Sequence, residues 1–171
     1  EKQINAIIEA SQEIGVIEIA NDNAPGQIVI SGIADAVDKA IDEAKSAGLR
    51  RAIKLPVSAP FHCKLMAPAA DLMQDALETS PIENALMPVF CNVTAAPETV
   101  ADKLRANLVE QVTGRVRWRE SMLAMQTAGC HRFIELGTGK VLSGLAKRTL
   151  NAVSVVNLDG PDDLDSVLAE L

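Results

Sequence analysis

The sequence contains very few aromatic residues: three Phe, one Trp and no Tyr, or 2% of its 171 positions. Proteins that bind single-stranded nucleic acid usually stack the bases on aromatic side chains, so this composition argues against that class. The 23 acidic residues outnumber the 16 basic ones and give a formal net charge of -7 at pH 7. Because nucleic acids and anionic membranes attract basic surfaces, we expect neither as a partner. No apolar run in these 171 residues approaches the ~20 residues that cross a bilayer, so we expect no transmembrane helix.

Cysteine and histidine are also scarce. The three cysteines (Cys63, Cys91, Cys130) are widely spaced without a Cys-x-x-Cys pair, and the two histidines (His62, His131) lie far apart. A zinc site needs such ligands at close, regular spacing, so we expect no metal. An odd number of isolated cysteines favours a reduced, cytoplasmic protein with free and mostly buried thiols.

The apolar pattern of the first third predicts a helix, two strands, a second helix and a third strand. These elements cover 4–13, 15–20, 27–31, 35–47 and 51–57, with a turn at Asn23–Gly26 between the first two strands. Pro followed by Gly suits a type II turn, because Pro fixes φ and Gly accepts a positive φ. The order is that of a split βαβ unit without its first strand. Since the chain also opens within a helical pattern and without Met, we expect a fragment of a longer protein.

Helices and strands alternate in the remainder of the chain. The periodicity predicts helices at 64–79, 99–112, 118–127, 140–150 and 162–170, and strands at 87–91, 132–136 and 152–156. Alternation of this kind indicates an α/β protein with a parallel sheet covered by helices. At this length, with 48% hydrophobic residues, the chain can bury a core and form one or two domains.

The most informative segment is 55–63, with the sequence LPVSAPFHC. His62 lies there in a proline-rich loop between a predicted strand and a predicted helix, where folds often present reactive groups. Imidazole is the side chain best suited to proton transfer near neutral pH. The alternative is a loop histidine that caps a helix or faces solvent. Ser58 is not part of a Gly-x-Ser-x-Gly motif, so nothing in the sequence positions it as a nucleophile. A catalytic pair of Cys63 and His62 is not expected either, because adjacent side chains usually point apart.

Gly137-Thr138-Gly139-Lys140 looks like the end of a phosphate-binding loop. It does not fit the full pattern, because Ile134 occupies the upstream glycine position and Val141 stands where Ser or Thr would bind magnesium. A tight turn from a strand into a helix is the better interpretation, although its backbone N–H groups could still bind an anion. Patches of basic residues could hold a phosphate or an acidic partner, but solvated surface charge is the more common explanation.

Three segments occur in an order that is typical of one family: NDNAPGQIVISG at 21–32, LPVSAPFHCKLM at 55–66 and ELGTGKVL at 135–142. On these segments the chain closely resembles the C-terminal part of the bacterial malonyl-CoA:acyl carrier protein transacylases of type II fatty acid synthesis. The resemblance covers essentially the whole chain but little more than half of the usual enzyme. It implies an α/β-hydrolase-like large subdomain that carries a ferredoxin-like small subdomain. Residues 1–57 would be the small subdomain without its first strand, and residues 58–171 the C-terminal section of the large one.

The resemblance also implies ping-pong acyl transfer. In the family, a serine takes malonyl from coenzyme A and passes it to the pantetheine thiol of acyl carrier protein. By resemblance, His62 would activate that serine, and the backbone carbonyl of Gln111 would orient the imidazole. The nucleophilic serine, the arginine that pairs with the malonyl carboxylate and the N-terminal oxyanion loop have no counterpart in this chain. We therefore expect the isolated chain to be inactive without an N-terminal segment.

Further roles follow from the resemblance. Phe61 would crowd an α-methyl branch on the acyl group, and Asn23 and Gln27 would lie near the pantetheine arm. The residues expected to dock acidic acyl carrier protein or the nucleotide phosphates are Arg50, Arg51, Lys147 and Arg148. The expected partners are malonyl-CoA, acyl carrier protein and the N-terminal part of the same enzyme. No cofactor is expected, because the coenzyme A thioester is itself a substrate.

Two other interpretations stay open. The chain could be a truncated, non-catalytic fragment that binds acyl carrier protein or serves as a scaffold. It could also belong to an acyltransferase domain of a polyketide synthase, which uses the same chemistry. A Gly-His-Ser-x-Gly motif encoded upstream of Glu1 would favour an enzyme over a scaffold.

Overall fold

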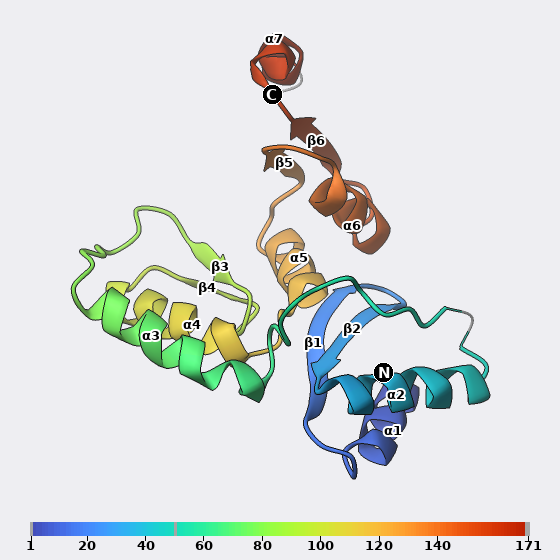
Figure 1. Cartoon of the computed structure of the whole chain (residues 1–171). Helices are drawn as coiled ribbons and strands as arrows, with labels where there is room; N and C mark the ends of the chain where they lie inside the picture. Colours follow the sequence, from blue (N-terminus) through green and yellow to red (C-terminus); the bar gives the residue numbers. More distant parts are fainter. Residues whose placement is uncertain (1, 50, 170–171) are drawn as a thin grey trace.

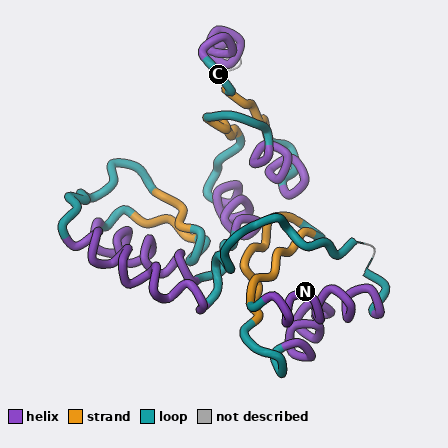
Figure 2. Tube along the Cα trace, viewed as in Figure 1, coloured by secondary structure: helices purple, strands orange, loops and turns teal. Residues whose placement is uncertain are grey.

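The computed structural model describes residues 2–49 and 51–169. Within this part of the chain, the strands form three separate two-stranded sheets, each accompanied by helices (Figures 1 and 2). The protein is thus a mixed α/β fold, as the alternating pattern predicted. Among the described residues, no helix is both long and apolar enough to cross a membrane.

The N-terminal elements form an antiparallel hairpin with two helices packed beside it. They are α1 (Lys2–Ser11), β1 (Ile17–Ala24), β2 (Gln27–Gly32) and α2 (Ala34–Ser46). Ala24 pairs with Gln27 across the turn, and Gly26 adopts the positive φ of +74° that the Pro-Gly pair predicted. The apolar stripes of the two helices meet the hairpin in one core, built from Ile7, Ile8, Ile17, Ala36, Ala40 and Ala44.

The middle of the chain pairs two helices with a short hairpin (Figure 1). It contains η1 (Lys64–Met66), α3 (Ala67–Glu78), β3 (Val89–Cys91), β4 (Ala96–Glu98) and α4 (Ala101–Thr113). The predictions missed β4, a strand of only three residues that includes Pro97. Because β4 follows β3 after a tight turn, the two strands pair in antiparallel orientation; a parallel pair would need a long crossover.

The C-terminal elements form the one parallel strand pair of the described chain. They are α5 (Trp118–Thr127), β5 (Arg132–Leu136), α6 (Val141–Thr149), β6 (Ser154–Leu158), η2 (Pro161–Asp163) and α7 (Leu164–Ala169). The β5–β6 pair runs from Arg132 opposite Ser154 to Leu136 opposite Leu158. Its helices bury a second core around Met122, with partly buried side chains packed against it. The prediction of a parallel sheet is therefore confirmed for this pair alone.

The strand predicted at 51–57 is wrong. The segment has an irregular backbone without ladder pairing, and its large apolar side chains are exposed: Ile53 is 58% exposed and Val57 62%. A strand needs a neighbouring backbone to bond with, and no described strand pairs with this segment. The apolar alternation is real, but nothing in the described chain completes it.

The expectation that the thiols are mostly buried holds for only one of the three cysteines. Cys63 is completely buried, Cys91 is half-buried and Cys130 is exposed. All three are free thiols, in agreement with the lack of paired spacing.

Candidate functional site

His62 lies where the irregular segment meets η1, with a backbone φ of +59°. Residues other than glycine rarely adopt this left-handed conformation. Contacts beyond His62 fix the loop: the buried Cys63 thiol donates to the Pro60 carbonyl (Sγ···O 3.2 Å). The Lys64 N–H donates to a carboxylate oxygen of Glu18 on β1 (2.9 Å). Because such a backbone persists only where its surroundings impose it, the fold holds this imidazole in a defined place.

The half-buried imidazole of His62 meets the end of α4. Gln111 lies in the last turn of this helix, where carbonyl groups lack N–H partners within the helix. Its backbone carbonyl oxygen lies 2.9 Å from Nδ1 of His62. A carbonyl can only accept, so Nδ1 carries the proton in this hydrogen bond and Nε2 of the neutral ring keeps its lone pair. A ring held in this tautomer is arranged to act as a general base.

The side chain of Gln111 makes a further contact that the sequence did not predict. Its Oε1 accepts a hydrogen bond from Nδ2 of Asn92 (3.3 Å), which follows β3. The Asn92 carbonyl in turn accepts from the Arg117 N–H (2.9 Å). In the sequence, Asn92 was marked only by its position directly after a predicted strand, where polar side chains are common. His62, Gln111 and Asn92 thus form one chain of contacts.

The residues predicted near the pantetheine arm lie around the β1–β2 turn. Asn23 is half-buried near the end of β1, and Gln27 begins β2. Arg148 of α6 donates from Nη1 to Oε1 of Gln27 and from Nη2 to the Pro25 carbonyl (3.4 Å). The structure therefore joins Gln27 to Arg148, two residues predicted for different roles. Phe61, beside His62, is 49% exposed.

The other residues predicted to dock an acidic partner are distributed over the surface. Lys147 and Arg148 are exposed in the last turn of α6, where cations also interact favourably with the helix dipole. Arg51 is exposed in the irregular segment after α2. Arg50 lies outside the described residues. Among the described residues, no hydrogen bond or ion pair joins Arg51 to the α6 pair, so the structure does not place them in a single cluster.

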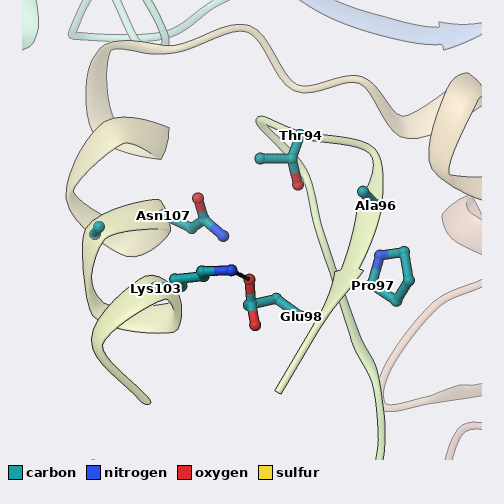
Figure 3. Close-up of a pocket in the computed structure, with 7 residues that line it drawn as sticks. Thr94, Ala96, Pro97, Glu98, Lys103 and Asn107 are labelled. Carbon is teal, nitrogen blue, oxygen red and sulfur yellow. Dashed lines mark ion pairs between the residues drawn. The ribbon is translucent and has the colours of Figure 1, made fainter. Parts of the chain in front are cut away.

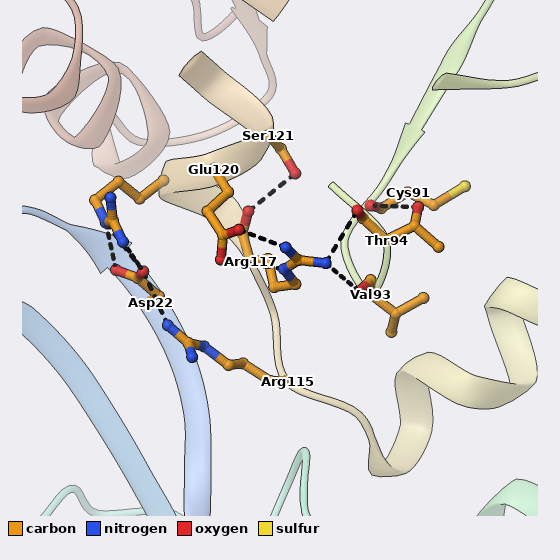
Figure 4. A network of polar contacts seen from close by, with 9 residues as sticks. Asp22, Cys91, Val93, Thr94, Arg115, Arg117, Glu120 and Ser121 are labelled. Atoms are coloured by element: carbon orange, nitrogen blue, oxygen red, sulfur yellow. Dashed lines mark hydrogen bonds and ion pairs between the residues drawn. The ribbon is translucent and has the colours of Figure 1, made fainter. Parts of the chain in front are cut away.

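A buried carboxylate joins the hairpin to α5, as Figure 4 shows. Asp22 of β1 is 1% exposed and lies between two guanidinium groups. Arg119 donates to it from Nε (2.9 Å) and Nη2 (2.6 Å), and Arg115 donates from Nη2 (3.0 Å). A backbone hydrogen bond from the Asp22 N–H to the Val116 carbonyl (2.9 Å) reinforces this junction. Both arginines belong to the basic patches for which solvated surface charge was the more common explanation, so the sequence did not predict this junction.

The glycine-rich turn before α6 is filled by carboxylates of the chain itself. Glu135 accepts the N–H groups of Leu142 (3.0 Å) and Ser143 (2.7 Å), and Asp159 accepts that of Gly139 (3.0 Å). The nearby Ser143 hydroxyl and these N–H groups lower the pKa of Glu135 below its ordinary value. An external anion would have to displace these carboxylates, so the structure speaks against anion binding at this turn.

A shallow hollow of about 240 Å³ lies between β4 and α4 (Figure 3). An ion pair between Lys103 and Glu98 (3.5 Å) crosses it. Its lining consists of Thr94, Ala96, Pro97, Glu98, Lys103, Ala106 and Asn107, none of them a predicted site residue. In the part of the chain that the structure describes, no group of three or more His, Cys, Asp or Glu side chains could hold a metal ion.

The chain matches no family model. It is 39% identical over 163 residues to the malonyl CoA-acyl carrier protein transacylase of Bacillus subtilis (strain 168). This match covers 95% of this chain and 51% of the relative. The crystal structure of the acyl-carrier-protein-S-malonyltransferase from Bartonella henselae matches with a TM-score of 0.95 and 42% identity. That match covers 99% of this chain and 54% of the other.

A second solved structure contains a carrier protein. It is a type II PKS acyl-carrier protein in complex with its malonyl-transacylase, matched with a TM-score of 0.95 and 35% identity. The match covers 100% of this chain and 55% of the other. The chain thus spans about half the length of the relatives that it matches.

Proposed function

We propose that this chain, a homologue of one half of the malonyl CoA-acyl carrier protein transacylases, supplies the catalytic histidine of such an enzyme. The reaction would transfer malonyl from coenzyme A to the pantetheine thiol of acyl carrier protein. The observation that carries this proposal is the 2.9 Å contact between Nδ1 of His62 and the carbonyl of Gln111. It uses Nδ1 in a hydrogen bond and so leaves the basic Nε2 to accept a proton from a reacting group.

The proposed chemistry has two half-reactions. A serine hydroxyl gives its proton to Nε2 of His62 as its oxygen attacks the malonyl thioester. The imidazolium then protonates the departing coenzyme A thiolate, which leaves malonyl on the serine. In the second half-reaction, His62 takes the proton of the pantetheine thiol, whose sulfur attacks the ester, and returns that proton to the serine. Through both steps the Gln111 carbonyl stabilises the Nδ1–H without placing a second negative charge beside the malonyl carboxylate.

The serine, the arginine for the malonyl carboxylate and the oxyanion loop would come from a segment that corresponds to the other half of the relatives. Large apolar side chains on the described surface support a further covering segment, because burying them would stabilise the assembly through the hydrophobic effect. Leu72, Leu136 and Val141 are each more than 70% exposed, at 71%, 74% and 71%. The segment 51–57 likewise has exposed apolar side chains and pairs with no described strand.

Within this proposal, the two parts of the chain belong to different subdomains. The helix-flanked hairpin up to residue 57 would belong to a ferredoxin-like small subdomain, and residues 58–171 to the C-terminal section of an α/β-hydrolase-like subdomain. The parallel β5–α6–β6 unit supports the second assignment, since parallel strands joined by a helix are the building unit of that fold class.

The substrate would enter past the β1–β2 turn. Asn23 and Gln27 would contact the pantetheine arm, and Phe61 would select malonyl over branched acyl groups. The contact between Arg148 and Gln27 supports a path that continues from the arm to the surface used by an acidic carrier. Lys147, in the same turn of α6, would add positive charge to that surface, whereas docking by Arg50 and Arg51 rests on the family resemblance alone. The enzyme would act in the cytoplasm and need no cofactor or metal, since the thioester is already activated.

The test is a transfer assay with radiolabelled malonyl-CoA. Protein purified under native conditions, with any polypeptide that accompanies it, should label acyl carrier protein, whereas the 171-residue chain alone should not. The assay should include carriers of fatty acid and of polyketide synthesis, because one matched structure contains a type II PKS carrier. Labelling of the isolated chain by malonyl-CoA would contradict the proposed division of roles.

A further inference from the structure

We propose that Asn92 is a positioning residue for His62, acting through the side chain of Gln111. Its functional meaning rests on the role proposed for His62. The inference itself concerns how the imidazole is held, so it can be tested apart from acyl transfer.

Asn92 anchors the residue whose carbonyl holds the imidazole. Its Nδ2 donates to Oε1 of Gln111 (3.3 Å), while the backbone oxygen of the same Gln111 accepts from His62 (2.9 Å). Gln111 lies two residues before the end of α4, where helices fray because few backbone hydrogen bonds remain. A side-chain anchor at this point restricts the direction of the carbonyl. Both groups are neutral amides, so the anchor adds no charge beside the imidazole.

Asn92 is itself fixed by Arg117. The Arg117 N–H donates to the Asn92 carbonyl (2.9 Å), and its Nη1 donates to the next two carbonyls, of Val93 (3.4 Å) and Thr94 (3.1 Å). The guanidinium is held in turn by the Glu120 carboxylate. Figure 4 shows this guanidinium between Glu120 and the β3–β4 turn. An arginine that holds three successive residues of a turn makes the turn a rigid support for the Asn92 side chain.

The end of α4 and the β3–β4 turn also approach each other closely. A Cβ atom on Gly114, directly after the helix, would lie 3.0 Å from Cγ1 of Val93 and 2.8 Å from the Glu110 carbonyl oxygen. Glycine is therefore required where the turn packs on the helix end. The lack of a side chain at Gly114 lets the turn that carries Asn92 pack closely on the helix end that carries Gln111.

The test measures the tautomer of His62 by nitrogen-detected NMR of the imidazole at alkaline pH. The chain has only two histidines, so the signals separate readily and His131 serves as an internal reference. In the unaltered chain we expect the Nδ1–H tautomer with slow exchange of its proton. Asn92→Ala should lower the ratio of the Nδ1–H to the Nε2–H tautomer roughly fivefold, the effect of losing about one net hydrogen bond.

Gln111→Ala removes the other end of the contact while it keeps the backbone carbonyl. It should lower the tautomer ratio by the same factor, and the double variant should show no further loss. If Asn92→Ala does not fold, Gln111→Ala carries the same prediction by itself. Asn107→Ala is the matched control, because Asn107 lies one turn earlier on α4 and lines the hollow of Figure 3. An unchanged tautomer ratio in folded Asn92→Ala or Gln111→Ala, or an equal change in Asn107→Ala, would overturn the proposal.

Discussion

Replacing Asp22 with alanine should destabilise the chain more than any comparable change at an exposed acidic residue. The carboxylate is 1% exposed and receives hydrogen bonds from both Arg115 and Arg119. Without it, two guanidinium groups with side chains only 27% and 29% exposed would face each other. The two positive charges would repel each other, and because neither guanidinium group is fully hydrated, water would screen this repulsion only in part.

The structure sets the expected magnitude. Removing one partner of a buried charge pair costs about 3–5 kcal/mol, and the partial exposure of both arginines places this case near the lower figure. Asp38→Ala is the matched control, because Asp38 pairs with Lys54 at 2.8 Å while both side chains are about half exposed, at 55% and 54%. Such a surface pair contributes about 0.2–1 kcal/mol. Asp22→Asn should lose most of what Asp22→Ala loses, because the amide cannot neutralise the guanidinium charges.

Urea unfolding followed by circular dichroism measures these differences. With a slope of about 2 kcal/mol per M, a loss of about 3 kcal/mol lowers the midpoint by about 1.5 M, whereas Asp38→Ala should lower it by about 0.5 M at most. Far-UV spectra at zero denaturant establish that each variant is folded. Equal midpoints for Asp22→Ala and Asp38→Ala would refute the argument that the buried carboxylate holds the hairpin to α5.

Three further predictions concern selectivity, docking and acid stability. In the complete enzyme, Phe61→Ser should raise the kcat/KM ratio of methylmalonyl-CoA to malonyl-CoA about tenfold, and an unchanged ratio would remove Phe61 from the acyl pocket. The KM for acyl carrier protein should rise with ionic strength, since exposed cations such as Arg148 would attract the acidic carrier; a KM insensitive to salt would count against charge-mediated docking. Glu135→Gln should lower the urea midpoint at pH 7. Because the folded-state pKa of Glu135 is lowered, its stabilising effect is present above the unfolded value of about 4.3 and is lost as pH falls through the lower folded value, so the two midpoints should converge in acid.

Local patterns predicted the elements well where those elements are complete within a short stretch. The ranges 118–127 and 132–136 agree with α5 and β5, because the first has helical periodicity, the second is a short apolar segment, and a glycine follows each element closely. The strand at 51–57 failed for the opposite reason. Its side chains alternate as in a strand, but strand formation depends on a neighbouring backbone that no local pattern reveals.

The candidate site was predictable in part. His62 stood out from its residue type and its loop, whereas Gln111 was found only through family resemblance, since any residue can offer a backbone carbonyl. Asn92 and Asp22 were missed because their contacts join distant segments. Asp22 and Arg119, for example, are 97 positions apart in the sequence. Contacts of this kind form when distant segments pack together, so no spacing of residues in the sequence predicts them.

The decisive measurement is kcat/KM for malonyl transfer in natively purified enzyme, compared between His62→Ala and His131→Ala. His131 is the chain's other histidine and lies exposed just before β5. If His62 is the general base, its loss should lower kcat/KM by about 100-fold or more, while His131→Ala retains the original value. A folded His62→Ala enzyme that transfers malonyl at the original rate would contradict the proposed role of this imidazole.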